Sequence, residues 1–239
     1  MLTKDFTLNK TEFIAYLQCP FQFYLLKELS AKTTTDIRLS DYEPFLQAGL
    51  EKHLWFQHFY KRYGSVITTS STPSLNDFDC SAWWKRTFFT FECDRYLQDP
   101  TFWAPVAVEY SLSSDCYFGK IDRIDLLNVQ GHCRVVDYKS SPKPFDEEEL
   151  LFYALLLTDT LPCSDFPTLT QITEIGLYYY STGEFFTAKI TPSVLDLFRD
   201  YLWSIRQEML SRLSVKKSIT CDSSLTSCLY RDLCQRISL

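Results

Sequence analysis

The sequence predicts a single α/β domain in which a mixed central sheet is flanked by helices. Segments rich in β-branched and aromatic residues alternate along the chain with segments of helical periodicity. The chain has 239 residues, of which 46% are hydrophobic. This composition is ample for one core, and the length does not suit several large domains. Disorder is therefore not expected.

The first predicted helix begins near Thr11, which is the expected N-cap. Cys19-Pro20 interrupts the helical pattern, which then resumes over residues 21–29. A cysteine at a helix break is placed to leave the core, but a lone cysteine is more often a small buried hydrophobic residue. Both interpretations of Cys19 stay open here.

The second predicted helix spans residues 41–63 and contains Gly49 and His53, which lie four residues apart and share a face. The missing side chain at Gly49 is expected to let this helix approach the sheet closely while His53 projects toward it. His53 is therefore a candidate metal ligand. The alternative is a packed, hydrogen-bonded histidine in an aromatic helix.

A linker rich in Ser and Thr is predicted over residues 65–76, followed by an aromatic helix over residues 77–97. The Trp and Phe side chains of that helix are expected in the core rather than as a platform for stacked bases. Residues 106–112 are predicted to form a strand, on which Glu109 is a weaker acidic candidate.

The centre of the chain is predicted to be a hairpin of two strands, residues 117–127 and 132–138, joined by a polar turn that ends at Gly131. A turn centred between residues 129 and 130 places Asp122 opposite Asp137. Paired positions bring Cβ atoms to roughly 4.5–5.5 Å. Two ionised carboxylates at that distance repel by roughly 3 kcal/mol at an effective dielectric constant near 20, and a divalent cation would relieve the repulsion.

Lys139 lies on the same face as Asp137, whereas Tyr138 points the other way and offers its backbone carbonyl. Hard oxygen ligands suit Mg²⁺ or Mn²⁺ better than Zn²⁺. A neighbouring lysine can orient a metal-bound water or stabilise charge on a phosphoryl oxygen. The face therefore predicts metal-assisted phosphodiester hydrolysis.

A second interpretation of the hairpin stays open. Asp122 would pair with Arg123 or Lys120, Asp137 would pair with Lys139, and the hairpin would be an ordinary solvated edge. A slip of one residue in the register would separate the two aspartates and favour this alternative.

A helix with an acidic first turn is predicted over residues 146–157, and favourable interaction with the helix N-terminus explains the first three acids. Glu149 and Tyr153 lie four residues apart, and this pair is expected to face the site and orient a metal-bound water or a phosphate. A second hairpin over residues 172–190 and a long helix from Pro192 to about Leu213 complete the predicted elements.

The C-terminal segment holds three closely spaced cysteines, Cys221, Cys228 and Cys234. Thiolates this close in sequence usually hold a metal, and Cys19 is the expected fourth ligand. Iron and zinc both remain possible. The other five cysteines show no ligand spacing and are expected to be buried.

The net charge of −6 argues against a uniformly basic nucleic-acid-binding protein. From Arg199 onward there are seven Lys or Arg against four Asp or Glu, so this section carries +3 and the rest −9. Contact with DNA is therefore expected to be local. No segment resembles a signal peptide or a membrane span, and a cytoplasmic location is expected.

The order of these motifs resembles the PD-(D/E)XK nuclease superfamily. They are Cys19, Gly49-x-x-x-His53, Gly119-Lys-Ile-Asp122-Arg, Val-Asp137-Tyr-Lys139, Glu149-x-x-x-Tyr153 and Cys228-x5-Cys234. The likeness is to the RecB-like branch with an iron–sulfur cluster, which includes CRISPR-associated adaptation exonucleases and the nuclease domains of AddAB-type repair enzymes. The resemblance implies a restriction-endonuclease-like core.

The resemblance also implies a role for each matching residue. His53, Asp122, Asp137 and the Tyr138 carbonyl would bind Mg²⁺ or Mn²⁺, Lys139 would be the catalytic lysine, and Tyr153 would be the tyrosine of the Gln-x-x-x-Tyr motif, with Glu149 at its first position. Cys19, Cys221, Cys228 and Cys234 would bind a 4Fe–4S cluster that joins extensions at residues 1–30 and 214–239.

Two positions depart from the family pattern. Glu149 stands where the family usually has Gln, which adds negative charge near a phosphate-binding position. Leu225 stands where the usual Cys-x2-Cys-x5-Cys tail has its first cysteine, so Cys221 would have to substitute for it.

The expected function is that of a Mg²⁺- or Mn²⁺-dependent DNA exonuclease on single-stranded or frayed ends, in repair, recombination or CRISPR adaptation. A helicase or CRISPR adaptation proteins are the expected partners. The alternative is a non-catalytic DNA-binding or scaffold subunit of a larger nuclease complex.

Overall fold

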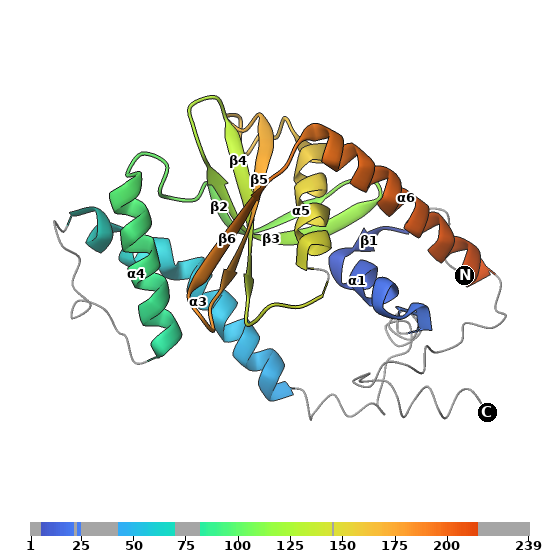
Figure 1. The fold of residues 1–239 in the computed structure, drawn as a ribbon, viewed down its shortest axis with the longest axis horizontal. Helices are drawn as coiled ribbons and strands as arrows, with labels where there is room; N and C mark the ends of the chain where they lie inside the picture. The colour runs from blue at the N-terminus through green and yellow to red at the C-terminus, as the bar shows by residue number, and fades with distance from the viewer. Residues whose placement is uncertain (1–5, 22, 25–42, 70–81, 145, 215–239) are drawn as a thin grey trace.

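A computed structural model describes residues 6–21, 23–24, 43–69, 82–144 and 146–214. Within these residues a six-stranded mixed sheet is covered by helices on both faces (Figure 1). The α/β fold class expected from the sequence is therefore confirmed. None of the helices in the described ranges is long and apolar enough to cross a membrane.

The sheet has the strand order β1-β3-β4-β5-β6, and β2 also pairs with β3. The β1–β3 and β4–β5 pairs are parallel, and the other pairs are antiparallel. The strands are β1 (Leu8–Asn9), β2 (Ala107–Ser113), β3 (Tyr117–Leu126), β4 (His132–Lys139), β5 (Gln171–Tyr179) and β6 (Glu184–Lys189). The helices are α1 (Lys10–Gln18), α3 (Glu43–Thr69), α4 (Trp83–Gln98), α5 (Asp146–Thr160) and α6 (Pro192–Ser214).

Each face of the sheet has its own core. Helix α5, with α1 and α6 beside it, packs on one face, where Phe13 of α1 stacks on Phe152 of α5 with ring centroids 5.9 Å apart. Helices α3 and α4 cover the other face with aromatic side chains such as Phe56 and Phe88, which contact Tyr138 of β4. The sheet is thus buried on both sides, as expected for parallel pairing in an α/β protein.

The central hairpin has the register predicted from its turn. Arg123 pairs with Val136 and Leu126 with Cys133, and Gly131 ends the turn with φ +84°. A Cβ atom at Gly131 would lie 2.2 Å from a backbone oxygen of Thr168, so only glycine fits there. The same register places Asp122 opposite Asp137.

The N-cap of helix α1 lies two residues before the predicted one. Asn9, rather than Thr11, is the N-cap: its side chain accepts a hydrogen bond from the Glu12 N–H at 2.9 Å, and the Glu12 carboxylate accepts one from the Asn9 N–H at 3.3 Å. This capping box satisfies two backbone donors at once, which a hydroxyl at Thr11 inside the first turn cannot do. The helix ends at Cys19, as predicted.

Helix α3 runs six residues beyond the predicted end, through Thr69, so the first residues of the predicted linker are helical. Gly64 alone does not end the helix, because Ile67 continues the apolar stripe and is fully buried against α4. Burial of one more apolar turn outweighs the poor helix propensity of the Ser and Thr residues around it.

Candidate active site

The candidate active site lies where strands β3 and β4 separate. Asp122 and Asp137 stand opposite each other one position beyond the last paired residues, Arg123 and Val136. The Oδ2 atom of Asp122 accepts a hydrogen bond from the Tyr138 N–H at 2.8 Å. Asp122 therefore satisfies a backbone donor at the end of the ladder and leaves its Oδ1 atom for another partner.

Glu109 brings a third carboxylate to the same place from β2. It lies between Val108 and Tyr110, whose partners on β3 flank Asp122. Its φ of +51° is in the left-handed region that residues with a Cβ seldom adopt, and such strain is often found at functional sites. Glu109, Asp122 and Asp137 thus occupy corresponding positions on three neighbouring strands.

His53 reaches this group from helix α3. Its Nδ1 atom lies 2.8 Å from Glu109 Oε1 and 3.5 Å from Asp122 Oδ1. The side chain of His53 is 34% exposed, whereas those of Glu109 and Asp122 are 4% and 8% exposed. The histidine therefore forms the solvent-facing side of a buried pair of acids.

These three residues fit a divalent metal ion. Their ligand atoms all lie within 4.8 Å of one another. Neighbouring ligand atoms around an octahedral Mg²⁺ or Mn²⁺ at about 2.1 Å are roughly 3 Å apart, so small side-chain adjustments suffice. Two carboxylates and one imidazole suit Mn²⁺ well and Mg²⁺ acceptably, whereas no thiol is among them to favour Zn²⁺.

The electrostatics of the group show the repulsion that a cation would relieve. Burial and the neighbouring Asp137 and Glu109 raise the pKa of Asp122 to about 8. The hydrogen bond to Glu109 raises the pKa of His53 above its ordinary value. Burial would raise the pKa of Glu109, but His53 and Lys120 hold it below its usual range. Protons thus occupy positions that a bound cation would take.

Asp137 is held by two lysines rather than by His53. Its Oδ2 atom lies 2.9 Å from the Lys139 ammonium, and its Oδ1 atom lies 3.7 Å from the ammonium of Lys10. Burial would raise the pKa of Asp137, but Lys10 and Lys139 hold it below its ordinary value. The two lysines therefore favour the ionised form of Asp137, whereas burial and the neighbouring carboxylates favour the protonated form of Asp122.

The interpretation of the hairpin as an ordinary solvated edge is wrong. Asp122 and Asp137 are 6% and 2% exposed. Arg123 pairs with Glu92 and Asp125, and Lys120 pairs with Glu109, so neither cation neutralises Asp122. The Asp137–Lys139 pair does form, but inside the protein.

A family comparison completes these observations. The model of the PD-(D/E)XK nuclease superfamily matches residues 7–235, which is nearly the whole chain. The chain belongs to this superfamily. A search of curated proteins found no match.

Membership of the PD-(D/E)XK superfamily indicates a metal-dependent nuclease that acts on DNA and uses divalent ions such as Mg²⁺ or Mn²⁺. The group of His53, Glu109 and Asp122, where the β3–β4 ladder ends, is the part of the described structure that suits such ions. The superfamily match thus agrees with the chemistry of the donor atoms.

The PD-(D/E)XK resemblance also singled out Glu149 and Tyr153. Both lie on α5, and the structure places them beside Lys139 of β4. The Lys139 ammonium contacts the Glu149 carboxylate. A Cβ atom at Gly119 of β3 would lie 3.0 Å from the Tyr153 ring, so glycine allows α5 to approach the sheet closely. Asp146 fixes the start of α5 by accepting hydrogen bonds from the Tyr179 hydroxyl at 3.0 Å and the Lys143 N–H at 2.8 Å.

Tyr138 contributes its backbone to this site and its side chain to the opposite core. Its ring stacks on Phe56 with centroids 4.3 Å apart. The N–H and C=O of one strand residue point to the same side, so the Tyr138 carbonyl faces the same gap as the N–H bonded to Asp122. This orientation is the one that the predicted ligand role of the carbonyl requires.

The reason given from the sequence for Gly49 is wrong. Among the described residues, which include all six strands of the sheet, no atom lies within 4 Å of a Cβ atom built on Gly49, so this glycine does not mediate close packing of α3 on the sheet. Gly119 has that role instead, on the other face. Because Gly49 has no side chain, space that no described residue fills lies one helical turn before His53.

Among the cysteines predicted to bind a cluster, only Cys19 lies in the described residues. It is fully buried at the end of α1, with an extended backbone. Cys221, Cys228 and Cys234, and Leu225 with them, lie outside the described residues. The cluster therefore stays a prediction.

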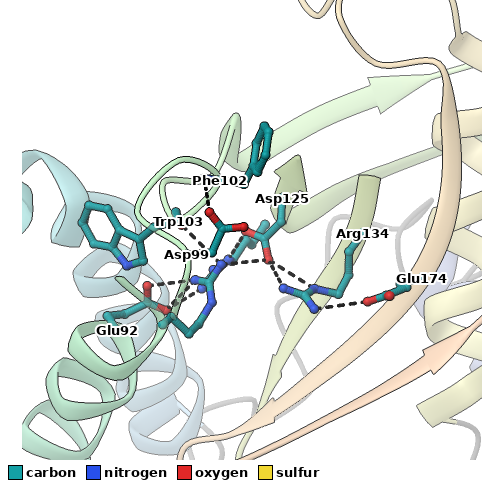
Figure 2. A network of polar contacts seen from close by, with 9 residues as sticks. Glu92, Asp99, Phe102, Trp103, Asp125, Arg134 and Glu174 are labelled. Carbon is teal, nitrogen blue, oxygen red and sulfur yellow. Dashed lines mark hydrogen bonds and ion pairs between the residues drawn. The ribbon is translucent and has the colours of Figure 1, made fainter. Parts of the chain in front are cut away.

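A buried network of charges lies behind the site, on the face covered by α4. Arg123, which is 1% exposed, binds Glu92 of α4 at 2.7 Å and Asp125 at 2.6 Å. Arg134 links Asp125 to Glu174 at 3.0 and 3.2 Å (Figure 2). The network joins α4 to three strands and fixes the strand segment that carries Asp122.

Sequence reasoning missed Lys10 and ranked Glu109 too low. Lys10 has no motif around it, and only the pairing of β1 with β3 brings it to the site. Glu109 could have been found from the register of β2, since its neighbours in sequence pair with the residues on either side of Asp122.

Proposed function

We propose that this chain is a Mg²⁺- or Mn²⁺-dependent DNA exonuclease of the RecB-like branch that acts on single-stranded or frayed ends. The observation that carries the proposal is the convergence of His53, Glu109 and Asp122 beside the Asp137–Lys139 pair, at the end of a β ladder. This arrangement combines hard metal ligands with a cation that can reach a phosphate. Repair, recombination or CRISPR adaptation is the setting that the resemblance suggests.

In the proposed reaction each residue has a defined task. A divalent ion, when bound, supplies positive charge that activates water and stabilises the phosphoryl oxygens. His53, Glu109 and Asp122 would hold it, with the Tyr138 carbonyl and Asp137 on the adjoining strand as further ligands. Lys139, held 2.9 Å from Asp137, orients the attacking water and stabilises charge on the phosphate.

The test is cleavage of end-labelled linear and circular DNA, single- and double-stranded, with Mn²⁺, Mg²⁺ or EDTA. An exonuclease degrades linear but not circular DNA, and activity requires a metal. Lys139→Ala is the matched inactive variant. Equal cleavage by wild-type and Lys139→Ala protein would indicate a contaminating nuclease and refute the assignment.

The second candidate function is a non-catalytic DNA-binding or scaffold subunit. One observation favours it: the Lys139 ammonium is engaged by both Glu149 and Asp137 and so is not free for a phosphate in this arrangement. Binding of DNA without metal-dependent cleavage by folded protein would support this function. A helicase or CRISPR adaptation protein would then be the partner to test.

The proposal also includes a 4Fe–4S cluster bound by Cys19, Cys221, Cys228 and Cys234. Iron and acid-labile sulfide are measured in anaerobically purified protein, together with the absorption spectrum. Four irons per chain, lost in Cys19→Ser, support the cluster. Stoichiometric zinc in colourless protein would show that these cysteines bind zinc and not iron.

A further inference from the structure

Lys10 is the first residue of helix α1 and places a second ammonium in the candidate site. Its Nζ atom lies 3.3 Å from Glu149 Oε2 and 3.7 Å from Asp137 Oδ1, and 5.0 Å from the centre of the Tyr153 ring. The Lys10 side chain is 21% exposed. These contacts join α1 to the residues on β4 and α5 that surround Lys139.

The position of Lys10 is fixed by backbone pairing. Leu8 and Asn9 pair in parallel with Tyr117 and Phe118 at the start of β3. Asn9 then caps α1, so the next side chain emerges at the first turn of the helix. Lys10 therefore reaches the gap between β3 and β4 as a consequence of the sheet.

Its local environment within α1 does not favour a lysine. The N-terminus of a helix carries partial positive charge, which disfavours a cation in the first turn. The contacts with Asp137 and Glu149 offset this cost. A lysine at this position is therefore explained by the carboxylates it meets and not by the helix that carries it.

Lys10 and its three charged neighbours carry no net charge as a group. Asp137 and Glu149 supply two negative charges, and Lys10 and Lys139 supply two positive charges. Both ammonium groups contact both carboxylates. Without Lys10, Lys139 would face two carboxylates, and one negative charge would be left uncompensated where a DNA phosphate must approach.

We propose that Lys10 is a positioning residue of the nuclease site, which offsets the negative charge of Glu149 beside Lys139 and so lowers the repulsion that a DNA phosphate meets there. This inference rests on the proposed function for its reference to DNA. Its charge balance, however, applies to the protein without DNA. The two parts can therefore be tested separately.

Lys10→Met removes the charge and keeps the length of the side chain. Loss of a cation near the carboxylates is expected to tighten Mn²⁺ binding, and gain of net negative charge is expected to raise the KM for DNA, each by about tenfold. Glu149→Gln has the opposite effects, with weaker Mn²⁺ binding. In the double variant both quantities return to within about twofold of wild type, because the paired charges are removed together.

Mn²⁺ affinity is measured by calorimetry on full-length protein without DNA, and KM by cleavage of single-stranded DNA at fixed salt. Lys85→Met is the matched control, since Lys85 also lies over an aromatic ring, 5.5 Å from the centre of the Trp84 ring, but on α4. It should change neither quantity. Thermal unfolding shows that each variant is folded, and Lys10→Arg should retain wild-type values.

The inference fails if Lys10→Met binds Mn²⁺ with the same affinity as Lys85→Met. It also fails if Glu149→Gln does not shift the Mn²⁺ affinity and the KM in the direction opposite to Lys10→Met. A misfolded Lys10→Met leaves Glu149→Gln alone to decide: unchanged Mn²⁺ affinity in that variant refutes the inference. Failure of the nuclease proposal looks different. The Mn²⁺ affinities would then shift as expected while wild-type protein cleaves no DNA.

Discussion

The Asp122 carboxylate accepts a hydrogen bond from the backbone N–H of Tyr138 at 2.8 Å, at the point where β3 and β4 separate. One side chain therefore has two tasks: it completes the strand pairing and presents its other oxygen to His53. Loss of the charge and loss of the hydrogen bond can be separated by the choice of substitution. This gives the first prediction.

Asp122→Asn and Asp122→Ala are both expected to abolish cleavage and weaken Mn²⁺ binding, because each removes the charge. Only Asp122→Ala leaves the Tyr138 N–H without an acceptor, so it should be less stable than Asp122→Asn by about 1–3 kcal/mol. Urea unfolding measures the difference. Full activity in Asp122→Asn would show that this residue binds no metal.

Glu109→Gln tests the carboxylate that the sequence ranked low. Because Glu109 Oε1 lies 2.8 Å from His53, its charge is expected to support both the metal and the protonated histidine. The variant should bind Mn²⁺ at least about tenfold more weakly and cleave DNA correspondingly more slowly. Histidine NMR titration should show a lower pKa for His53. An unchanged Mn²⁺ affinity would exclude Glu109 from the ligand set.

Mn²⁺ affinity should rise as the pH increases from 6 to 9. Asp122, with a pKa of about 8, and His53, with a raised pKa, must both lose protons before they bind a metal. Calorimetry in buffers of different ionisation enthalpy would count the protons released. An affinity that does not depend on pH in this range would contradict the assignment of both ligands.

The same pKa shift predicts the pH dependence of stability. The pKa of Asp122 is raised on folding, so between the ordinary carboxyl range and pH 8 the folded state holds a proton that the unfolded state has lost. In EDTA, stability should therefore fall as the pH rises toward about 8 and level off above it. Saturating Mn²⁺ should remove this fall, and so should Asp122→Asn. Chemical unfolding at a series of pH values provides the measurement.

Two glycine substitutions should have opposite effects on stability. Gly119→Ala places a Cβ atom 3.0 Å from the Tyr153 ring and should destabilise the protein by about 1–3 kcal/mol. Gly49→Ala adds a Cβ atom that meets no described atom within 4 Å, and because alanine favours a helix it should stabilise the protein by up to about 1 kcal/mol. Urea unfolding of both variants decides whether Gly119, and not Gly49, sets a close approach of helix and sheet.

The buried charge network should be costly to break. Glu92→Gln removes one of the two carboxylates that bind Arg123, whose side chain is 1% exposed, and is expected to destabilise the fold by about 3–5 kcal/mol. Arg212→Met is the control, because Arg212 pairs with Glu208 at the surface and should contribute less than about 1 kcal/mol. Equal unfolding free energies for the two variants would show that the network contributes no special stability.

The sequence predicted the central elements well because their signals are local. The turn ending at Gly131 fixed the register that sets Asp122 opposite Asp137. Periodicity identified both β hairpins and most of the helices. The start of α1 was harder to predict, because several polar residues near it can cap a helix and the capping box decides between them. The extension of α3 was missed because it depends on burial against α4.

The full site could not be predicted because part of it depends on distant pairing. Nothing near Lys10 in the sequence marks it as a site residue; the parallel pairing of β1 with β3 does. The left-handed backbone of Glu109 likewise has no local signal, since glutamate rarely adopts it. The packing around Gly49 could not be predicted either, because it depends on which residues surround the helix.

Pairing of Leu8 with Tyr117 also bears on how the protein folds. The two residues are far apart in the sequence, so their contact closes a large loop, and the entropy lost in closing it is recovered only when α1 packs on α5. The hairpin and α5 can form earlier, because their contacts are local. During folding, Asp137 and Glu149 should therefore exist for a time without the Lys10 ammonium beside them.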